Sequence, residues 1–498
     1  MMFPLVMNKA TGKEYTVEKL HISANNRYFE KADGTPFVWL ADTAWTVPAR
    51  LKWDDVIHYM KTRKQQGFTV LQMVVLDPEY NEEMRNPCGI KALEENDLLK
   101  PNEAYFSYVD WVLDRAEEYG FYVLLLPVWG ELVVGWDWGG GTHPKYVTEE
   151  NVAAYGKWLG NRMRDRKNII WCLGGDRMPV CRGEDYRPVW RELAEGLSEG
   201  LTGTRLKYNA DREEWKKLLI TYHACHEAET GECSTFSYWT PDDCWISFTM
   251  LQSGHGAFKK NYDLVAAERE PKGEQGLVYP VWDGEPAYEM MPMTWPVEDL
   301  NSFHGTYIVR KRAYWSLLAG SFGHTYGHAS VWCTATEKDK NMICHVTWAE
   351  AIKSEGSEQM KILRDFMEAY DLTGFMPCQE RLLAQSSRED ELDTHEQAAV
   401  DVESKVMLVY FACAAEERID LSGVFESDVY AGWFDPKTGE VSVVEKVSAG
   451  DDGVLHICSK ADEDTILILA DDPAKICVPV GTYDEEDGPS ELKKVFEW

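Results

Sequence analysis

The stretch Val-Tyr-Pro-Val-Trp-Asp-Gly-Glu-Pro-Ala-Tyr-Glu, residues 278–289, decides the fold. Its apolar first half ends at Trp282 and predicts a buried strand. Asp283, Gly284, Glu285 and Pro286 then stop the strand and place a carboxylate just past its C-terminal end. Ligands of parallel α/β proteins bind at that end of the strands. We therefore interpret Glu285 as a catalytic carboxylate.

Seven other strand-like runs occur before and after this one, and helical segments separate most of them. The eight predicted strands are 37–42, 68–75, 121–127, 168–173, 218–222, 245–250, 277–282 and 319–328. Continuous apolar strands that alternate with helices indicate a parallel sheet. Eight such units over this length predict a closed (β/α)8 TIM barrel. The helix between the fifth and sixth strands is missing or very short.

The character of the chain changes near residue 378. Short strand-like runs follow at 398–412, 418–421, 429–434, 453–458 and 465–470, separated by turns such as Asp435-Pro-Lys-Thr-Gly439. This pattern predicts a small antiparallel β-sandwich. We therefore expect a β-rich N-terminal lead-in over 1–36, the barrel over 37–375 and the sandwich over 376–498.

Composition excludes several classes of partner. The 498 residues carry a net charge of −33, which disfavours binding to nucleic acids or anionic membranes. No apolar run reaches the roughly 20 residues that a membrane helix needs. The N-terminus lacks a secretion signal, and the 12 Cys include no CxxC pair. We expect free thiols and a cytoplasmic location; the sequence predicts no oligomeric state.

Three carboxylates follow predicted strands: Asp42, Asp176 and Glu285. In a barrel they would converge on one mouth, where the fourth and seventh strands lie opposite each other. Glycoside cleavage needs two facing carboxyl groups, about 5–5.5 Å apart for retention of configuration and about 6.5 Å or more for inversion. Asp176 and Glu285 form the natural pair, with Asp283 and Glu289 as rivals for the second position. An acid after a strand can also simply cap the next helix.

Aromatic and histidine side chains also follow the strands. Trp45, Trp129, Trp136 and Trp138 are candidate platforms for sugar rings, although large aromatic residues more often fill cores. His223, His255 and His324 could bind hydroxyl groups or a metal, and His223-Ala-Cys-His226 has a ligand-like spacing. The first strand, however, ends in Leu40-Ala-Asp42 and not in the His-x-His of metal-dependent barrel hydrolases. No serine elbow, Walker loop or dinucleotide fingerprint is present.

Four motifs in order resemble glycoside hydrolase family 140, the apiosidase-like group whose barrel was long classed as a domain of unknown function. They are Trp39-Leu-Ala-Asp-Thr-Ala-Trp45, Leu173-Gly-Gly-Asp176, Asp283-Gly-Glu-Pro-Ala-Tyr-Glu289, and Gly320-Ser-Phe-Gly-His-Thr-Tyr-Gly-His328 followed by Trp332. The tail motif Trp433-Phe-Asp-Pro-Lys-Thr-Gly439 is similar to the small β-sandwich, named for collagen binding, that follows this barrel.

The resemblance implies a cofactor-free, metal-free enzyme that removes a terminal sugar, such as apiose, from a plant-type oligosaccharide or glycoside, with retention. It implies that Asp176 is the acid/base, that Glu285 is the nucleophile, and that Asp42 and Trp45 line the sugar pocket. The full set of expected substrate-binding residues is Asp42, Trp45, Trp129, His223, His255, Trp282, His324 and Tyr326. The alternatives are a non-catalytic carbohydrate-binding protein and a metal-dependent barrel hydrolase.

Overall fold

The structure is a computed structural model of the chain. It describes residues 17–78, 83–227, 231–256, 260–294, 297, 299, 301–384, 394–425, 428–442, 444–461, 463–481 and 483. Residues 1–16 of the expected lead-in and 484–498 of the expected sandwich lie outside these ranges. Within them, no helix is long and apolar enough to cross a membrane.

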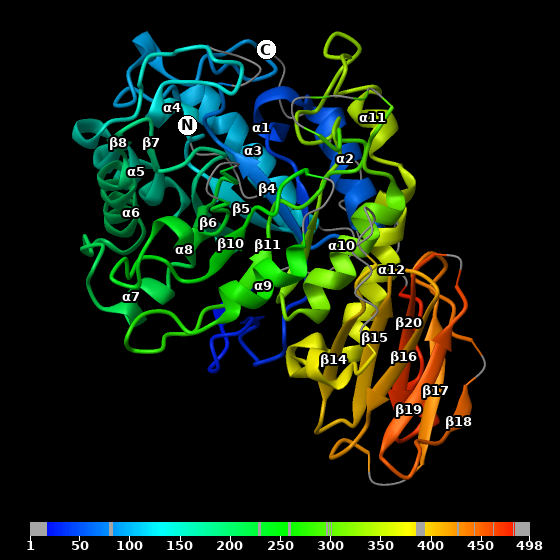
Figure 1. The fold of residues 1–498 in the computed structure, drawn as a ribbon. Helices are drawn as coiled ribbons and strands as arrows, with labels where there is room; N and C mark the ends of the chain where they lie inside the picture. Colours follow the sequence, from blue (N-terminus) through cyan, green and yellow to red (C-terminus); the bar gives the residue numbers. More distant parts are fainter. Residues whose placement is uncertain are drawn as a thin grey trace, which may run out of the picture.

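An eight-stranded parallel sheet forms the centre of the larger part (Figure 1). Its strands are β3 (Trp39–Thr43), β4 (Val70–Val74), β5 (Tyr122–Leu126), β6 (Ile169–Gly174), β9 (Ile220–His223), β10 (Thr249–Leu251), β11 (Val281–Asp283) and β12 (Gly323–Tyr326). They pair in the order β10-β11-β12-β3-β4-β5-β6-β9. The Ser247 N–H donates to the Ile220 carbonyl over 2.8 Å, and the Thr221 hydroxyl donates to the Phe248 carbonyl over 2.6 Å. These bonds join β9 to the residues just before β10, so the two end strands of the sheet come together and the predicted barrel is nearly closed.

Helices follow most of the barrel strands. They are α1 (Val47–Arg50), α2 (Trp53–Gln65), α3 (Glu103–Glu118), α4 (Glu131–Val134), α5 (Glu149–Met163), α6 (Arg187–Thr202), α7 (Arg212–Lys216), α8 (Thr235–Tyr238), α9 (Asn261–Arg269), α10 (Thr306–Leu318), α11 (Trp348–Ala351) and α12 (Glu355–Tyr370). The short 3-10 helix η1 (Glu94–Asn96) and the strands β7 (Val180–Cys181) and β8 (Glu184–Asp185) lie in loops. Of the described residues between β9 and β10, only those of the four-residue α8 form a helix, in agreement with the expectation of a missing or very short helix here.

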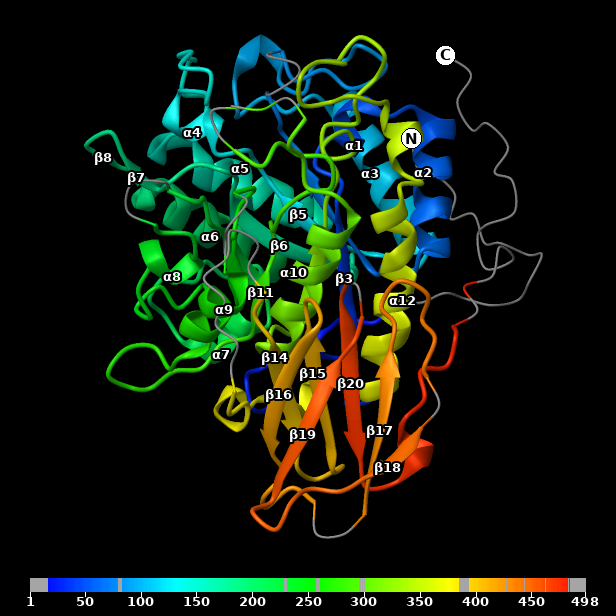
Figure 2. The same cartoon turned by 45° about the vertical axis from the view of Figure 1, so that its right-hand side comes forward.

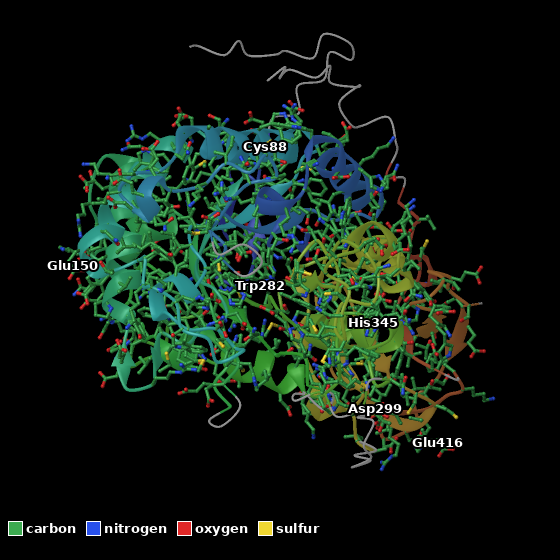
Figure 3. All side chains as sticks on the ribbon, turned by 90° about the horizontal axis from the view of Figure 1, so that it is seen from above. Cys88, Glu150, Trp282, Asp299, His345 and Glu416 are labelled. Carbon is green, nitrogen blue, oxygen red and sulfur yellow. The ribbon has the colours of Figure 1, made fainter. Side chains whose placement is uncertain are left out.

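Large aromatic side chains fill the barrel interior. Trp39, Phe248, Trp282 and Phe322 pack with ring centroids 5.4–6.4 Å apart. Phe29 lies 5.0 Å from Phe248 and belongs to β2 (Phe29–Glu30), which pairs with β1 (His21–Ile22). This lead-in hairpin therefore covers one end of the interior. In the view from above, Trp282 lies near the middle of the molecule (Figure 3).

An antiparallel sheet domain follows the barrel and packs beside α10 and α12 (Figure 2). Its strands are β13 (Met376–Pro377), β14 (Gln397–Asp401), β15 (Val406–Phe411), β16 (Ala415–Asp420), β17 (Val429–Phe434), β18 (Glu445–Val447), β19 (Val454–Ser459) and β20 (Thr465–Ala470), with the 3-10 turns η2 (Leu372–Gly374), η3 (Gln379–Arg381) and η4 (Pro473–Lys475). Six strands form one sheet, and β16 and β19 form the opposing pair. Arg310 of α10 donates to Asp464 over 2.8 Å and fixes the domain against the barrel.

Candidate active site

Glu285 lies two residues past the end of β11, on a backbone that hydrogen bonds hold in place. The Gly284 N–H donates to the Leu251 carbonyl over 2.9 Å, and the Gln72 amide donates to the Gly284 carbonyl over 3.0 Å. The Gly254 N–H donates to the Glu285 carbonyl over 3.1 Å. A Cβ at Gly284 would lie 2.6 Å from Met250, so only glycine allows the chain to turn this closely over the barrel interior.

Two histidines contact the carboxylate of Glu285, whose side chain is 8% exposed. His223 Nε2 lies 2.8 Å from Oε2, and His255 Nε2 lies 3.4 Å from Oε1. Burial alone would raise the pKa of Glu285, but the contacts with His223 and His255 outweigh burial and hold this pKa far below its usual range. Glu285 is therefore ionised at neutral pH, as a nucleophile or a general base must be.

Asp176 follows β6 on a left-handed stretch of backbone. Gly174 and Gly175 have φ of 94° and 126°, and Asp176 itself has φ of 45°. A Cβ at Gly175 would lie 2.6 Å from the Trp129 ring, so a side chain at this position would collide with the pocket wall. A non-glycine residue in this region is strained, and such strain is typical of functional sites.

Both oxygens of the Asp176 carboxylate accept hydrogen bonds. The Gln252 amide donates to Oδ1 over 2.8 Å, and the Trp138 indole N–H donates to Oδ2 over 2.6 Å. The guanidinium of Arg177 lies 3.4 Å from Oδ2. The Asp176 side chain is 21% exposed, so this carboxylate meets solvent while that of Glu285 is enclosed.

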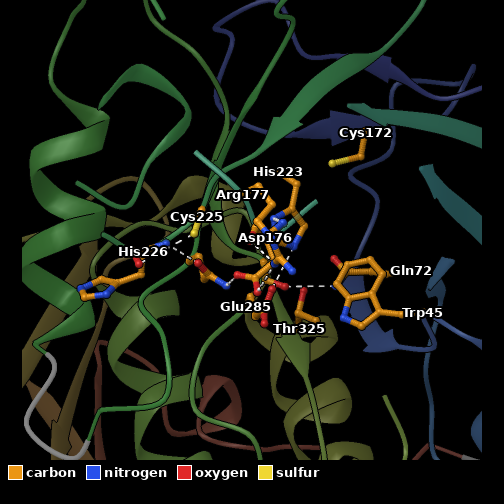
Figure 4. A network of polar contacts seen from close by, with 12 residues as sticks. Trp45, Gln72, Cys172, Asp176, Arg177, His223, Cys225, His226, Glu285 and Thr325 are labelled. Carbon is orange, nitrogen blue, oxygen red and sulfur yellow. Dashed lines mark hydrogen bonds and ion pairs between the residues drawn. The ribbon is translucent and has the colours of Figure 1, made fainter. Parts of the chain in front are cut away.

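His223 connects the two carboxylate residues through its two ring nitrogens (Figure 4). The backbone N–H of Asp176 donates to Nδ1 over 3.2 Å. Because Nδ1 accepts, the proton of the neutral ring lies on Nε2, the atom that faces Glu285. Burial, and secondarily the charges of Asp176 and Glu285, raise the pKa of the Cys225 thiol. Both carboxylates therefore act on one small region at the mouth of the barrel.

Aromatic rings pack around His223. The rings of Trp45 and Trp129 lie 5.4 and 5.7 Å from the His223 ring and 5.7 Å from each other. The Trp45 indole N–H donates to the Tyr288 hydroxyl over 3.3 Å. Burial and the charge of Glu285 raise the pKa of Tyr288, which keeps its hydroxyl protonated beside that carboxylate.

A second aromatic surface lies on the side of Asp176. Trp138 is 53% exposed although its N–H is bound to Asp176. Its loop is held by Asp137, which accepts from the Gly141 N–H over 2.8 Å and lies 2.6 Å from the His143 ring nitrogen. The open face of Trp138 is therefore presented at a fixed position next to the more exposed carboxylate.

Asp42 does not lie in the pocket, contrary to our expectation. It is fully buried on the outer face of β3, where its carboxylate accepts from Arg63 Nε over 2.8 Å and from the Tyr59 hydroxyl. Both partners belong to α2. Asp42 is a structural anchor between barrel and helix because side chains alternate along a strand and its position points outward.

His324 and Tyr326 also point outward, since β12 pairs them with Leu40 and Asp42. The Tyr326 hydroxyl donates to Glu289 Oε2 over 2.5 Å, and burial lowers the pKa of His324 to about 3. Trp282 points inward but is fully buried in the aromatic core, with its indole N–H on Thr325. None of these three expected pocket residues offers a surface to a sugar.

The two rival acids have structural partners. Asp283 points outward and accepts from the Ser253 hydroxyl over 2.7 Å. Glu289 accepts from the hydroxyls of Thr306, over 2.9 Å, and Ser354, over 2.8 Å. Both acids therefore bind groups other than His223, the residue at which Asp176 and Glu285 meet.

Two residues join the site that sequence reasoning did not assign to it. Gln252 binds Asp176, and Tyr288 lies beside Glu285. Trp138, a candidate platform in the sequence, also binds Asp176. Gln252 directly follows β10, so its position past a strand end was a usable signal. Within the described residues, no group of three or more His, Cys, Asp or Glu side chains could hold a metal ion.

Comparison with known proteins identifies the families of the two parts of the chain. Residues 23–374 match the family model "Apiosidase-like, catalytic domain", and residues 377–470 match "Putative collagen-binding domain of a collagenase". A solved structure described as a glycoside hydrolase is 25% identical, with a TM-score of 0.75 over 91% of this chain and 97% of the other. A family 5 glycoside hydrolase from Bacteroides vulgatus is 26% identical, with a TM-score of 0.74 over 91% and 94% of the two chains. No curated protein sequence matches.

Proposed function

Because the chain belongs to the family of apiosidase-like catalytic domains and is a glycoside hydrolase, we propose that it removes a terminal sugar with Asp176 as acid/base and Glu285 as nucleophile. The observation that carries this proposal is the pair of unlike carboxylates joined through His223: one enclosed and held ionised, the other partly exposed. A two-carboxylate glycosidase needs this division of roles.

The proposed reaction proceeds in two steps. Glu285 attacks the anomeric carbon while Asp176 protonates the departing glycosidic oxygen, so that the bond to the leaving group breaks as the glycosyl–enzyme bond forms. Asp176 then takes a proton from water, which attacks the same carbon and releases Glu285. The product keeps its anomeric configuration, and the step requires no cofactor.

The form of this activity that we propose is exo-acting. Trp45 and Trp129 pack against His223, and Tyr288 lies beside Glu285, so these rings would bound the subsite of a single terminal sugar. The leaving group would lie on the side of Asp176, where Trp138 offers an exposed aromatic face for a second sugar ring or an aromatic aglycone. The substrate class we propose is therefore a plant-type oligosaccharide or glycoside with a terminal apiose-like sugar, in line with a place in glycoside hydrolase family 140.

Hydrolysis of a panel of aryl glycosides and plant oligosaccharides tests this function. Asp176→Asn and Glu285→Gln should each lower kcat by about 1,000-fold or more, because each removes a group that acts in the transition state. Asp185→Asn changes an exposed acid of β8 and is the matched control. Full activity of either site variant would overturn the assignment, and sugar binding without turnover in the wild type would favour a non-catalytic carbohydrate-binding protein.

The stereochemical course can be read directly from the first product. Proton NMR during hydrolysis shows whether the newly released sugar has the anomeric configuration of the substrate, before mutarotation. Retention supports Glu285 as nucleophile, whereas inversion would make Glu285 the base that activates water. Activity that is lost with a chelator and restored by a metal would replace the two-carboxylate mechanism.

A further inference from the structure

A pair of buried cysteines lies in the segment that follows β12. The Sγ atoms of Cys333 and Cys344 are 3.6 Å apart, and both side chains are buried. The two thiols share an acceptor, since the Ala329 carbonyl lies 3.1 Å from the Cys344 sulfur and 3.8 Å from the Cys333 sulfur. Among the described residues, no two cysteines are joined by a disulfide in this structure.

We propose that Cys333 and Cys344 are an oxidative modification site, at which a peroxide converts the two thiols into a disulfide that closes the loop 334–343. The inference rests on the sulfur–sulfur distance and on the fixed backbone around both residues. It does not depend on the proposed function, because it concerns the reactivity of two thiols and not the chemistry of Asp176 and Glu285.

The backbone on both sides of the pair is held by local hydrogen bonds. The Asn341 side chain accepts from the N–H groups of Ile343, over 2.7 Å, and Cys344, over 2.9 Å. On the other side, the Ala335 N–H donates to the Ser330 carbonyl over 2.9 Å. These turns bring the sulfur atoms together before any bond forms, so oxidation needs only a small closing movement of the side chains.

The surroundings favour Cys344 as the reacting thiol. A hydrogen bond from Cys333 is the main cause that lowers the pKa of Cys344, and thiolates are the reactive form of cysteine. Met342, two residues before Cys344, is 54% exposed, so the chain next to the buried pair meets solvent.

The chemistry balances with one molecule of hydrogen peroxide. The Cys344 thiolate attacks a peroxide oxygen, the O–O bond breaks, and Cys344 becomes a sulfenic acid while hydroxide leaves and is protonated to water. The Cys333 sulfur then attacks the Cys344 sulfur, the S–O bond breaks, and the second water leaves. Two thiols are oxidised to one disulfide, and the peroxide is reduced to two waters.

The position of the pair links it to one wall of the pocket. The Thr46 N–H donates to the Trp332 carbonyl over 3.4 Å, and the Thr46 hydroxyl lies 2.9 Å from that of Thr334. Thr46 directly follows Trp45, whose ring packs against His223. A disulfide at residue 333 would therefore tie the exposed loop to the segment that supports this wall.

Peptide mapping of the full chain after treatment with hydrogen peroxide tests the proposal. Remaining thiols are alkylated under denaturing conditions, and the digest is compared with an untreated sample. We expect a linked pair of peptides containing residues 333 and 344, lighter by about 2 Da than their sum, that separates on reduction. Alkylation of both residues after peroxide, their overoxidation, or linkage to other cysteines would each overturn the proposal.

Thermal melting gives a second and independent readout. Closing a loop of about 12 residues restricts the unfolded chain and should raise the Tm of the peroxide-treated wild type by about 3–5 °C, reversibly with a reductant. Cys344→Ser should abolish this rise, whereas Cys458→Ser, which removes an exposed thiol in β19, should keep it. A rise of equal size in Cys344→Ser would contradict the assignment to this pair.

Discussion

Replacement of His223 tests how the protein keeps Glu285 ionised while buried. In His223→Asn the side chain still reaches the position of Nδ1, next to the Asp176 N–H, but no longer reaches Glu285. In His223→Gln the amide nitrogen can occupy the position of Nε2, 2.8 Å from the Glu285 carboxylate. The two variants therefore separate the contact with Glu285 from the contact with Asp176.

The expected size of the effect follows from the contact that is lost. A hydrogen bond to a buried charged group contributes about 1.5–3 kcal/mol, which corresponds to a fall in kcat/KM of about 10- to 150-fold for His223→Asn. Loss of this contact raises the pKa of Glu285, because burial then opposes ionisation with only His255 to offset it. Since Glu285 acts as the anion, kcat/KM of this variant should fall at a higher pH on the acid side than in the wild type.

The assay is the pH dependence of kcat/KM with the best aryl glycoside, together with thermal melting to show that both variants fold. We expect His223→Gln to retain most of the activity and to leave the acid limb near its wild-type position. Equal losses in the two variants, or an acid limb of His223→Asn that does not move, would refute the idea that His223 sets the charge of Glu285.

Asp42→Asn breaks the buried ion pair with Arg63 and should lower the free energy of unfolding by about 3–5 kcal/mol in chemical denaturation, with KM unchanged. A raised KM with unchanged stability would instead show that Asp42 contacts the substrate. Trp138→Phe keeps an aromatic face but loses the N–H that Asp176 accepts, so kcat should fall about 2- to 10-fold, and an unchanged kcat would contradict a positioning role. Burial lowers the pKa of His324 to about 3, against about 6.5 in the unfolded chain, so this residue favours the folded state above pH 6.5 and loses that contribution as the pH falls towards 3. Between pH 7 and pH 5 the loss is about 2 kcal/mol, and His324→Asn should remove this part of the pH dependence of unfolding; an unaltered slope would refute it.

The barrel could be predicted from the sequence because each strand is a local feature. Apolar runs with helices between them identify all eight strands, and the sheet order confirms them. The start of α10 could not be predicted in this way. It begins at Thr306, because the backbone of His304 just before it bonds instead to Met290 and Met291. The residues that form these backbone bonds lie before the helix, so the spacing of apolar residues within the helix does not reveal them.

The errors within the predicted site have one common cause: the sequence does not show which side chains of a strand point into the barrel and which point towards the helices. A strand of a parallel barrel is buried on both faces, by the interior on one side and by the helices on the other, so its sequence is apolar throughout and does not show which side chains point inward. Asp42, His324 and Tyr326 were expected in the pocket, but the register places all three on the outer face, while Trp282 points inward into the packed core.

The residues that do come together at the site lie past the strand ends. There the inward and outward alternation of side chains along a strand no longer decides their direction. Glu285, Asp176 and Gln252 occur one or two residues after β11, β6 and β10, and the local turn aims each side chain. For Glu285 and Asp176, a glycine before the acid lets the chain bend over the interior without a collision. In a barrel predicted from sequence alone, an acid that follows a glycine just after a strand is therefore a stronger candidate for a catalytic residue than an acid within the strand. Asp176 and Glu285 satisfy this condition, whereas Asp42 does not.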